Sequence, residues 1–261
     1  MSAQSHQQPI LLVNDVSLAF GGIVALDNVT FEVNRSQICG LIGPNGAGKT
    51  TLFNCLSRLY TPHDGTIVFD GHEILSMAAN EVAAIGIGRT FQNLALFNTM
   101  TVKENVLTGA HCLMRSNFLT DALRLPFVSS EERKYAQVAE ELIAFLELEP
   151  VRDVPVSQLS FGTRKRVEMA RALASNPKLL LLDEPAAGLN HEEVDKLMTL
   201  IQSLKDLFRL SVLLVEHHMN LVMRVSDKVV ALDFGRKIAD GAPETVRTDP
   251  DVIRAYLGSD Q

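Results

Sequence analysis

The chain contains a glycine-rich segment with the residue types and spacing of a phosphate-binding loop (P-loop), Gly43-Pro44-Asn45-Gly46-Ala47-Gly48-Lys49-Thr50. The segment fits the pattern G-x-x-x-x-G-K-[ST] and lies between an expected strand and an expected helix. Glycines let successive backbone N–H groups converge on phosphate oxygens, and the positive end of the following helix adds to the attraction. Lys49 would lie near the β- and γ-phosphates, and the Thr50 hydroxyl would coordinate Mg²⁺. We therefore predict that these eight residues and the adjacent Thr51 bind a nucleoside triphosphate.

Two acidic residues follow a run of leucines at 179–182. Asp183 would stand at the carboxyl end of a buried strand, where parallel sheets bind ligands, and would hold the metal ion. Glu184 comes next and would orient or deprotonate an attacking water molecule. The P-loop alone does not separate kinases, GTPases and ATP-driven machines, so other segments must decide among them.

A third segment, Leu159-Ser160-Phe161-Gly162-Thr163, resembles the signature loop of ATP-binding cassette (ABC) transporter ATPases. The resemblance to this family extends over almost the whole chain. It implies that Ser160 and Gly162 bind the γ-phosphate of an ATP molecule held by the opposite subunit, so that the protein works as a dimer. The commonest form of the signature has glycine in place of Phe161 and glutamine in place of Thr163.

Three further positions occur in the order that is typical of ABC ATPases. Gln92 matches the Q-loop glutamine, which reaches Mg²⁺ and the attacking water and links the site to a membrane partner. His217 matches the switch histidine, which bonds the γ-phosphate and the water. The family usually has Asp after that histidine, and His218 here is therefore the lesser candidate for the same role. Phe20 occupies the place where the family stacks an aromatic ring on adenine.

Longer segments are similar to the ATPases of branched-chain amino acid importers: 89–107, 183–190, 215–223 and 249–258. This resemblance implies ATP-driven import of branched-chain or related amino acids through two membrane permease subunits, supplied by an extracytoplasmic solute-binding protein. The second ATPase subunit is the same chain or a paralogue. We expect the chain at the cytoplasmic face of the plasma membrane, as a peripheral subunit.

Three alternatives remain. ATPases of lipopolysaccharide export share much of the same pattern, so an export system is the closest. Soluble ABC ATPases that act on DNA or ribosomes usually have two cassettes or large coiled-coil insertions, which this chain lacks. A nucleotide-sensing subunit without activity is disfavoured by the presence of Glu184 and His217.

The elements that must position these residues alternate between strand and helix patterns. Strands are predicted at 11–20, 25–33, 37–42, 66–69, 179–182, 212–215 and 229–232, with helical spacing at 51–59 and between about 100 and 151. This alternation predicts an α/β fold with a mostly parallel sheet. The resemblance implies a P-loop NTPase with a RecA-like core, an N-terminal antiparallel β subdomain and an inserted α-helical subdomain at about 94–157. We expect a single ATPase domain at 9–258 after a polar tail at 1–8.

Composition excludes several other classes of protein. The 261 residues include 24 basic and 31 acidic ones, a net charge of −7, and 46% are hydrophobic. Such a chain folds around a core and lacks the positive charge of a nucleic-acid-binding protein. We interpret the basic run 164–166 as a solvated helix face and the pair 236–237 as part of a turn, and expect no nucleic-acid partner. We expect neither a membrane-spanning segment nor a secretory signal in this sequence.

Overall fold

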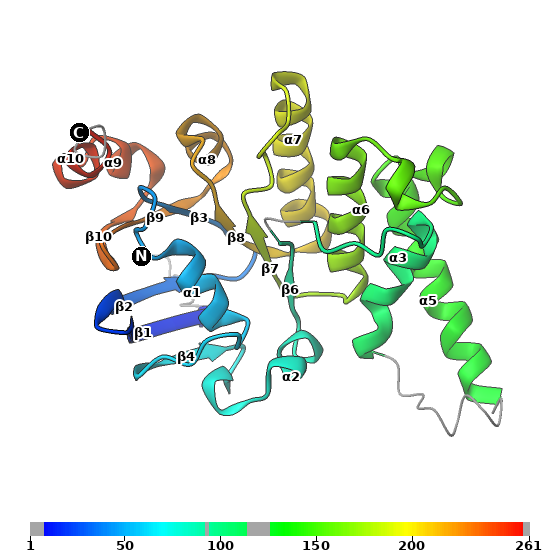
Figure 1. Ribbon diagram of the computed structural model, residues 1–261, viewed down its shortest axis with the longest axis horizontal. Helices are drawn as coiled ribbons and strands as arrows, with labels where there is room; N and C mark the ends of the chain where they lie inside the picture. Colours follow the sequence, from blue (N-terminus) through cyan, green and yellow to red (C-terminus); the bar gives the residue numbers. More distant parts are fainter. Residues whose placement is uncertain (1–7, 92–93, 114–125, 258–261) are drawn as a thin grey trace, which may run out of the picture. The chain divides into compact units, whose positions relative to one another are not determined.

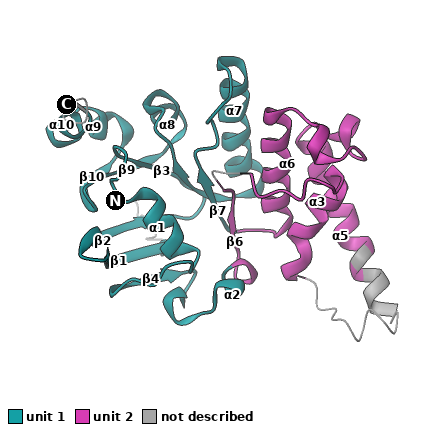
Figure 2. Cartoon of the chain, viewed as in Figure 1, with its two compact units in different colours: residues 1–82, 178–261 teal, residues 83–177 magenta. Residues whose placement is uncertain are grey.

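The computed structural model describes residues 8–91, 94–113 and 126–257 (Figure 1). The chain divides into two compact units, shown in Figure 2: unit 1 is formed by residues 1–82 and 178–261, and unit 2 by residues 83–177. Unit 1 contains two β-sheets and their helices, and unit 2 is mainly helical.

The first sheet of unit 1 is antiparallel and contains β1 (Leu11–Phe20), β2 (Ile23–Val33), β4 (Asp64–Phe69) and β5 (His72–Glu73) in the order β2-β1-β4-β5. Alternate residues of β1 are buried because successive side chains of a strand point to opposite faces. Gly21 and Gly22 have positive φ angles of 53° and 89° and form the turn between β1 and β2. The expected N-terminal antiparallel subdomain is confirmed.

The second sheet provides the core of unit 1, with strands in the order β10 (Arg236–Gly241), β9 (Lys228–Asp233), β3 (Ile38–Ile42), β8 (Ser211–Val215) and β7 (Leu179–Asp183). The neighbours from β9 to β7 pair in parallel, and β10 pairs antiparallel with β9. Every residue of β3, β7 and β8 is buried, which explains their almost uninterrupted apolar sequences. The predicted α/β fold with a mostly parallel core sheet is confirmed.

The helices of unit 1 are α1 (Lys49–Leu56), α7 (His191–Phe208), α8 (Met219–Val225), α9 (Pro243–Arg247) and α10 (Pro250–Leu257). A capping box starts α7: the Asn190 side chain accepts the Glu193 N–H, and the Glu193 carboxylate accepts the Asn190 N–H. Helix α8 packs on β3, while α9 and α10 pack on β10. Among the described residues, no helix has the length and apolar character needed to cross a membrane.

Unit 2 contains β6 (Ile87–Arg89), α3 (Val102–Gly109), α5 (Pro126–Phe145) and α6 (Phe161–Ala174), and α2 (Ala79–Ala84) leads into it. The three long helices pack against one another. Gly109 permits the close approach of α3 and α6, because a Cβ atom there would lie 1.9 Å from the Arg171 carbonyl oxygen. Short 3₁₀ turns lie at Ala110–Leu113, Glu149–Val151 and Val156–Gln158 of this unit, and another lies at Ile74–Ser76 of unit 1. The expected helical segment at 94–157 falls inside unit 2, which also includes α6.

Two local expectations were wrong. The basic run 164–166 is not a solvated helix face, because Lys165 is buried and the Arg164 and Arg166 guanidinium groups donate to the carbonyl oxygens of Leu159 and Leu146.

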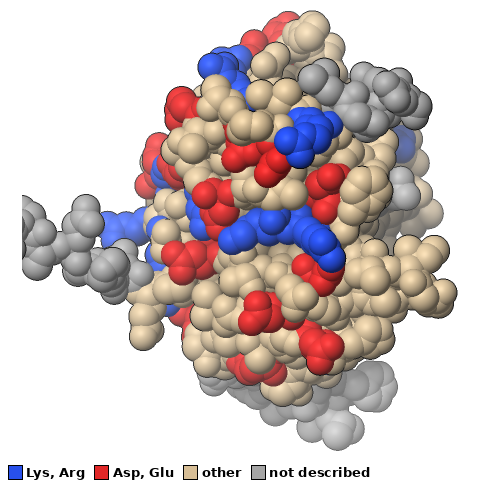
Figure 3. Space-filling view, turned by 90° about the vertical axis from the view of Figure 1, so that its left-hand side faces the viewer, with Lys and Arg blue, Asp and Glu red and all other residues tan. Residues whose placement is uncertain are grey.

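Arg236 and Lys237 begin strand β10, whereas the sequence suggested that they belong to a turn. The turn lies just before them, at Phe234 and Gly235, whose φ angles are +43° and +78°. Ion pairs hold the two basic residues on the strand: Arg236 with Asp27 at 2.6 Å and Lys237 with Asp240 at 3.2 Å. Figure 3 likewise shows basic side chains interspersed with acidic ones on one face of the molecule.

Candidate functional site

The P-loop connects the buried strand β3 to helix α1, and two of its glycines are required by close backbone contacts. At Gly43, where φ is +152°, a Cβ atom would lie 2.3 Å from the Leu232 carbonyl oxygen. At Gly48, where φ is +100°, it would lie 2.6 Å from the Ala25 carbonyl oxygen. No side chain larger than hydrogen fits at either position. The loop is therefore held closely against neighbouring backbone at its first and last glycines.

Lys49 lies inside this loop with only 7% of its surface exposed. Its Nζ atom donates hydrogen bonds to the carbonyl oxygens of Gly43 at 2.6 Å and Pro44 at 2.9 Å. Burial lowers the pKa of Lys49, and the nearby carboxylates of Glu184 and Asp183 oppose that shift. The lysine predicted to face phosphate is thus also close to both predicted acidic residues.

Asp183 and Glu184 lie where β7 ends. Asp183 is 2% exposed, and the side chain of Glu184 is 21% exposed. Glu184 adopts a φ of +47°, a conformation that is uncommon for residues other than glycine. Its N–H group donates to the Val215 carbonyl oxygen at 2.9 Å, which holds the residue against the end of β8. Uncommon backbone angles of this kind persist only where the surroundings fix them, and they often occur at functional sites.

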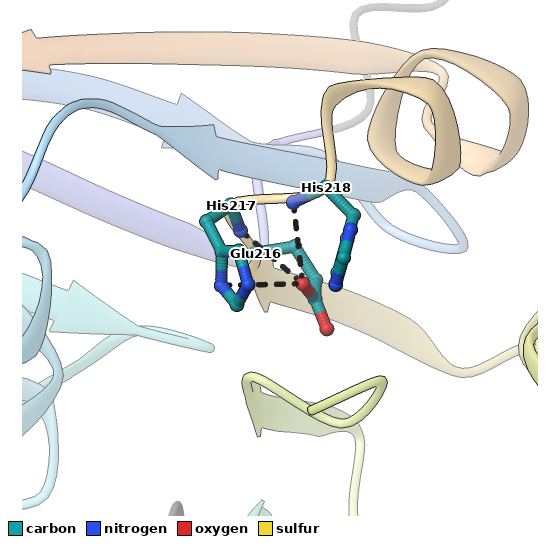
Figure 4. A group of neighbouring side chains, drawn as sticks. All are labelled: Glu216, His217 and His218. Atoms are coloured by element: carbon teal, nitrogen blue, oxygen red, sulfur yellow. Dashed lines mark hydrogen bonds and ion pairs between the residues drawn. The ribbon is translucent and has the colours of Figure 1, made fainter. Parts of the chain in front are cut away.

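The two histidines, His217 and His218, come just after β8, separated from it by Glu216 (Figure 4). The Nδ1 atom of His217 lies 3.9 Å from a carboxylate oxygen of Glu184, and its side chain is 48% exposed. The His218 ring lies beside that of His217, with 4.4 Å between the ring centroids, and His218 is the N-cap residue of α8. The structure thus brings His217 to the carboxylate assigned to catalysis.

Glu216 belongs to the site although the sequence analysis missed it. Its side chain is fully buried, and its carboxylate accepts the Ala186 N–H at 2.7 Å and the His217 N–H at 3.2 Å. The side chain therefore joins the loop after Glu184 to the loop that carries His217. The signal in the sequence was an acidic residue at the end of an all-apolar strand, the same signal that identified Asp183.

The side chains of Glu216, His217 and His218 have ligand atoms within 4.8 Å of one another, a spacing that a metal ion can use. The carboxylate of Glu216, however, is already occupied by backbone N–H groups through both of its oxygens. We therefore assign no metal ion to this cluster.

Phe20 lies at the end of β1 and is 45% exposed. Its ring makes an edge contact with Tyr60, a residue that the sequence analysis did not select, at a centroid distance of 5.1 Å.

Thr50 and Thr51 lie in the first turn of α1, where Thr50 is exposed and Thr51 is half-buried.

The signature residues lie at the start of α6 in unit 2. Ser160 is the N-cap residue: its hydroxyl oxygen accepts the Thr163 N–H at 3.3 Å, and Gly162 lies in the first helical turn. The remaining site residue, Gln92, lies outside the described residues.

Helix α6 also binds the backbone on both sides of position 92. The Phe91 N–H donates to the Glu168 carboxylate at 3.0 Å, and the Arg171 guanidinium donates to the Ala95 carbonyl oxygen. Glu168 is 1% exposed, and burial raises its pKa. The sequence analysis did not select Glu168 or Arg171, because neither residue belongs to one of the motifs it identified.

Comparisons with known proteins show what the chain is similar to. The family model described as "ABC transporter" matches residues 26–187, and one described as "Branched-chain amino acid ATP-binding cassette transporter" matches residues 236–261. The high-affinity branched-chain amino acid transport ATP-binding protein BraF of Pseudomonas aeruginosa is 42% identical over 251 residues, which cover 96% of this chain and 98% of BraF.

Two solved structures are also similar. The ADP conformation of MJ1267, an ATP-binding cassette of an ABC transporter, is 31% identical with a TM-score of 0.82 and covers 97% of this chain and 100% of its own. The dimeric bacterial ABC transporter cassette MJ0796 is 28% identical with a TM-score of 0.76 and covers 89% of this chain and 98% of its own.

Proposed function

Since the chain belongs to the ABC transporter family of ATPases, we propose that it is the ATP-hydrolysing subunit of an importer of branched-chain amino acids. Its substrate is ATP. The choice of cargo is supported by the identity of 42% to BraF and by the C-terminal match at residues 236–261. An ATPase subunit does not itself contain the cargo site, so the cargo follows from these relatives and not from the geometry.

One observation carries the catalytic assignment: a buried P-loop lysine, the Asp183-Glu184 pair and His217 meet at the carboxyl edge of the core sheet. We assign phosphate binding to residues 43–51, with Lys49 as the cation that contacts the β- and γ-phosphates. Glu184 orients or deprotonates the attacking water, and His217 donates a hydrogen bond to the γ-phosphate. Phe20, half exposed at the end of β1, stacks on adenine.

The donor set suits Mg²⁺, which prefers oxygen ligands and retains several waters. The hydroxyl of Thr50 and the carboxylate of Asp183 would hold the ion, with Gln92 as a further ligand. Thr50 is exposed in the first turn of α1, and Asp183 ends β7 beside Glu184. When bound, the ion neutralises charge on the phosphate oxygens.

The second ATPase subunit is the same chain or a paralogue. We propose that Ser160, Gly162 and the N-terminus of α6 bind the γ-phosphate of the ATP held by that other subunit, because a helix N-terminus attracts anions. The dimeric state of MJ0796 supports this arrangement. Residues 9–258 act as one ATPase domain, with 94–157 as its inserted helical part. Two permease subunits and a solute-binding protein complete the importer, and the ATPase subunits bind the permeases at the cytoplasmic face of the plasma membrane.

The test of the catalytic assignment is Glu184→Gln, which keeps the shape of the side chain and removes its charge. We expect ATP binding to persist, phosphate release to fall by about 100-fold or more, and an ATP-dependent dimer to accumulate. Phosphate release and molecular mass in solution with Mg·ATP measure these effects. The control is Glu141→Gln, an exposed carboxylate on α5 in unit 2, which should behave as the wild type. Wild-type phosphate release by Glu184→Gln would remove Glu184 from catalysis.

The cargo assignment needs a separate experiment. The chain is combined with its permeases and solute-binding protein in vesicles, and uptake of leucine, isoleucine and valine is compared with that of other amino acids. ATP-dependent uptake of the three branched-chain amino acids is expected, and its loss with Glu184→Gln links it to this subunit. Uptake of none of the three would refute the proposed cargo.

A further inference from the structure

Residues in the C-terminal part of unit 1 contact the P-loop. The Gly43 N–H donates to the Tyr256 hydroxyl oxygen at 2.8 Å, and the Gly235 N–H donates to the Ala47 carbonyl oxygen at 3.1 Å. The close contact between Gly43 and the Leu232 carbonyl oxygen adds a third fixed point. Residues from the β9–β10 hairpin and from α10 therefore contact the loop at its beginning and its middle.

Packing fixes the position of Tyr256. Its helix, α10, contributes Val252 to a buried cluster that also contains Ile42, the residue just before Gly43. Val246 of α9 belongs to the same cluster, and both valines are 1% exposed. The ring of Tyr256 packs against this cluster while its hydroxyl reaches the backbone of the loop. Burial raises the pKa of the Tyr256 hydroxyl.

Both polar backbone groups of Gly43 are bonded to side chains. Its N–H group donates to Tyr256, and its carbonyl oxygen accepts from Lys49 at 2.6 Å. Gly43 is buried, so an N–H group that lost its partner there would be costly. Together the two bonds fix the orientation of Gly43, the first residue of the P-loop.

We propose that Tyr256 is a positioning residue for nucleotide binding: its hydroxyl holds Gly43, and with it the P-loop, in the conformation that receives the phosphates. The proposal rests on the proposed function, because it takes residues 43–51 as the ATP site. It also assigns a role to the C-terminal segment that matches the branched-chain cassette family model.

The test is Tyr256→Phe, which removes one oxygen atom and keeps the ring. We expect the Kd for ATP and the KM to rise about three- to tenfold, because the loop must be ordered by the nucleotide itself. The kcat at saturating ATP should stay within about twofold of the wild type, because bound nucleotide restores the loop. Hydrogen exchange at the Gly43 amide should accelerate, because its acceptor is gone.

Tyr135→Phe is the matched control. The Tyr135 hydroxyl donates to the Leu113 carbonyl oxygen at 3.0 Å in unit 2, so this variant loses a similar hydrogen bond away from the loop. It should leave the Kd for ATP and the exchange of the Gly43 amide unchanged. Val252→Ala tests packing alone: it loosens α10 but keeps the hydroxyl, and should lower Tm without the exchange signature at Gly43.

The proposal would be overturned if Tyr256→Phe left both the Kd for ATP and the hydrogen exchange of the Gly43 amide unchanged. It would also be overturned if Tyr135→Phe changed these two quantities as much as Tyr256→Phe does. Lys49→Ala separates this failure from that of the proposed function. If Lys49→Ala abolishes ATP binding while Tyr256→Phe binds normally, only the role of Tyr256 is refuted. If Lys49→Ala binds ATP as tightly as the wild type, the nucleotide site is wrongly assigned and the proposal falls with it.

Discussion

Glu216 gives the sharpest quantitative prediction for the site. Its carboxylate is fully buried and accepts N–H groups from Ala186 at 2.7 Å and from His217 at 3.2 Å. Ala186 follows Glu184 by two residues, so one side chain fixes the loop of the catalytic glutamate and the loop of the switch histidine. Removing that carboxylate should disturb both loops together.

The size of the effect follows from the two bonds. A buried backbone N–H left without a partner costs about 1–3 kcal/mol. Glu216→Ala leaves both N–H groups without this acceptor, so we expect the free energy of unfolding to fall by about 2–6 kcal/mol, which lowers Tm by about 4–24 °C for a chain of this size. Glu216→Gln keeps one acceptor oxygen and turns an amide NH₂ toward the other N–H, which should lower the free energy of unfolding by about 1–2 kcal/mol. In both variants kcat should fall about tenfold or more, because small displacements of catalytic groups are costly.

The assay combines thermal unfolding with kcat and KM for ATP. The matched control is Glu73→Gln: the Glu73 carboxylate also accepts two backbone N–H groups, from Leu75 at 3.1 Å and Ser76 at 2.9 Å, at a turn after β5. This control should lower Tm slightly and leave kcat unchanged. If Glu216→Gln has wild-type kcat and Tm, the carboxylate does not position the two loops and the reasoning is wrong.

Two further predictions concern the histidines and the pH dependence of stability. His217→Ala should lower kcat about tenfold or more and His218→Ala less than threefold, because the His217 ring lies 3.9 Å from Glu184; the reverse order in steady-state assays would make His218 the switch residue. Hydrogen bonds from Lys178 and Arg35 lower the pKa of Asp70 from 3.8 to about 2, so its stabilising effect is complete above pH 4 and is lost as the pH falls toward 2. Since the Arg35 and Lys178 side chains are exposed, Asp70→Asn should lower the free energy of unfolding by only about 1 kcal/mol at pH 7. The Tm of this variant should fall less between pH 4 and pH 2 than the Tm of the wild type. Parallel curves of Tm against pH for the variant and the wild type would contradict this.

Local sequence signals predicted the parts of the fold that are regular and buried. Strand β1 was predicted with its observed bounds at 11–20, and the leucine run at 179–182 became β7 with Asp183 as its last residue. The P-loop was recognisable because its glycines meet a backbone requirement that no other residue satisfies.

Other features depended on contacts between distant residues. Strand β10 has no fully buried residue, so it lacks the apolar pattern by which strands are recognised. Tyr256 meets Gly43 across 213 positions of sequence, and Glu216 meets Ala186 across 30. No local pattern encodes such partners, because they are set by the order of strands in the sheet and by the packing of helices on it.

Helix α6 carries both the signature-loop serine and the two side chains that bind the backbone near position 92. Ser160 lies at its N-terminus, while Glu168 and Arg171 bind the backbone at Phe91 and Ala95. The helix has 14 residues and is therefore about 21 Å long, and its axial hydrogen bonds resist stretching. Because Ser160, Glu168 and Arg171 are on one stiff helix, a displacement of Ser160 along the helix axis would also displace the backbone at Phe91 and Ala95. Substitution of Glu168 or Arg171 should weaken this mechanical coupling and leave Ser160 chemically unchanged.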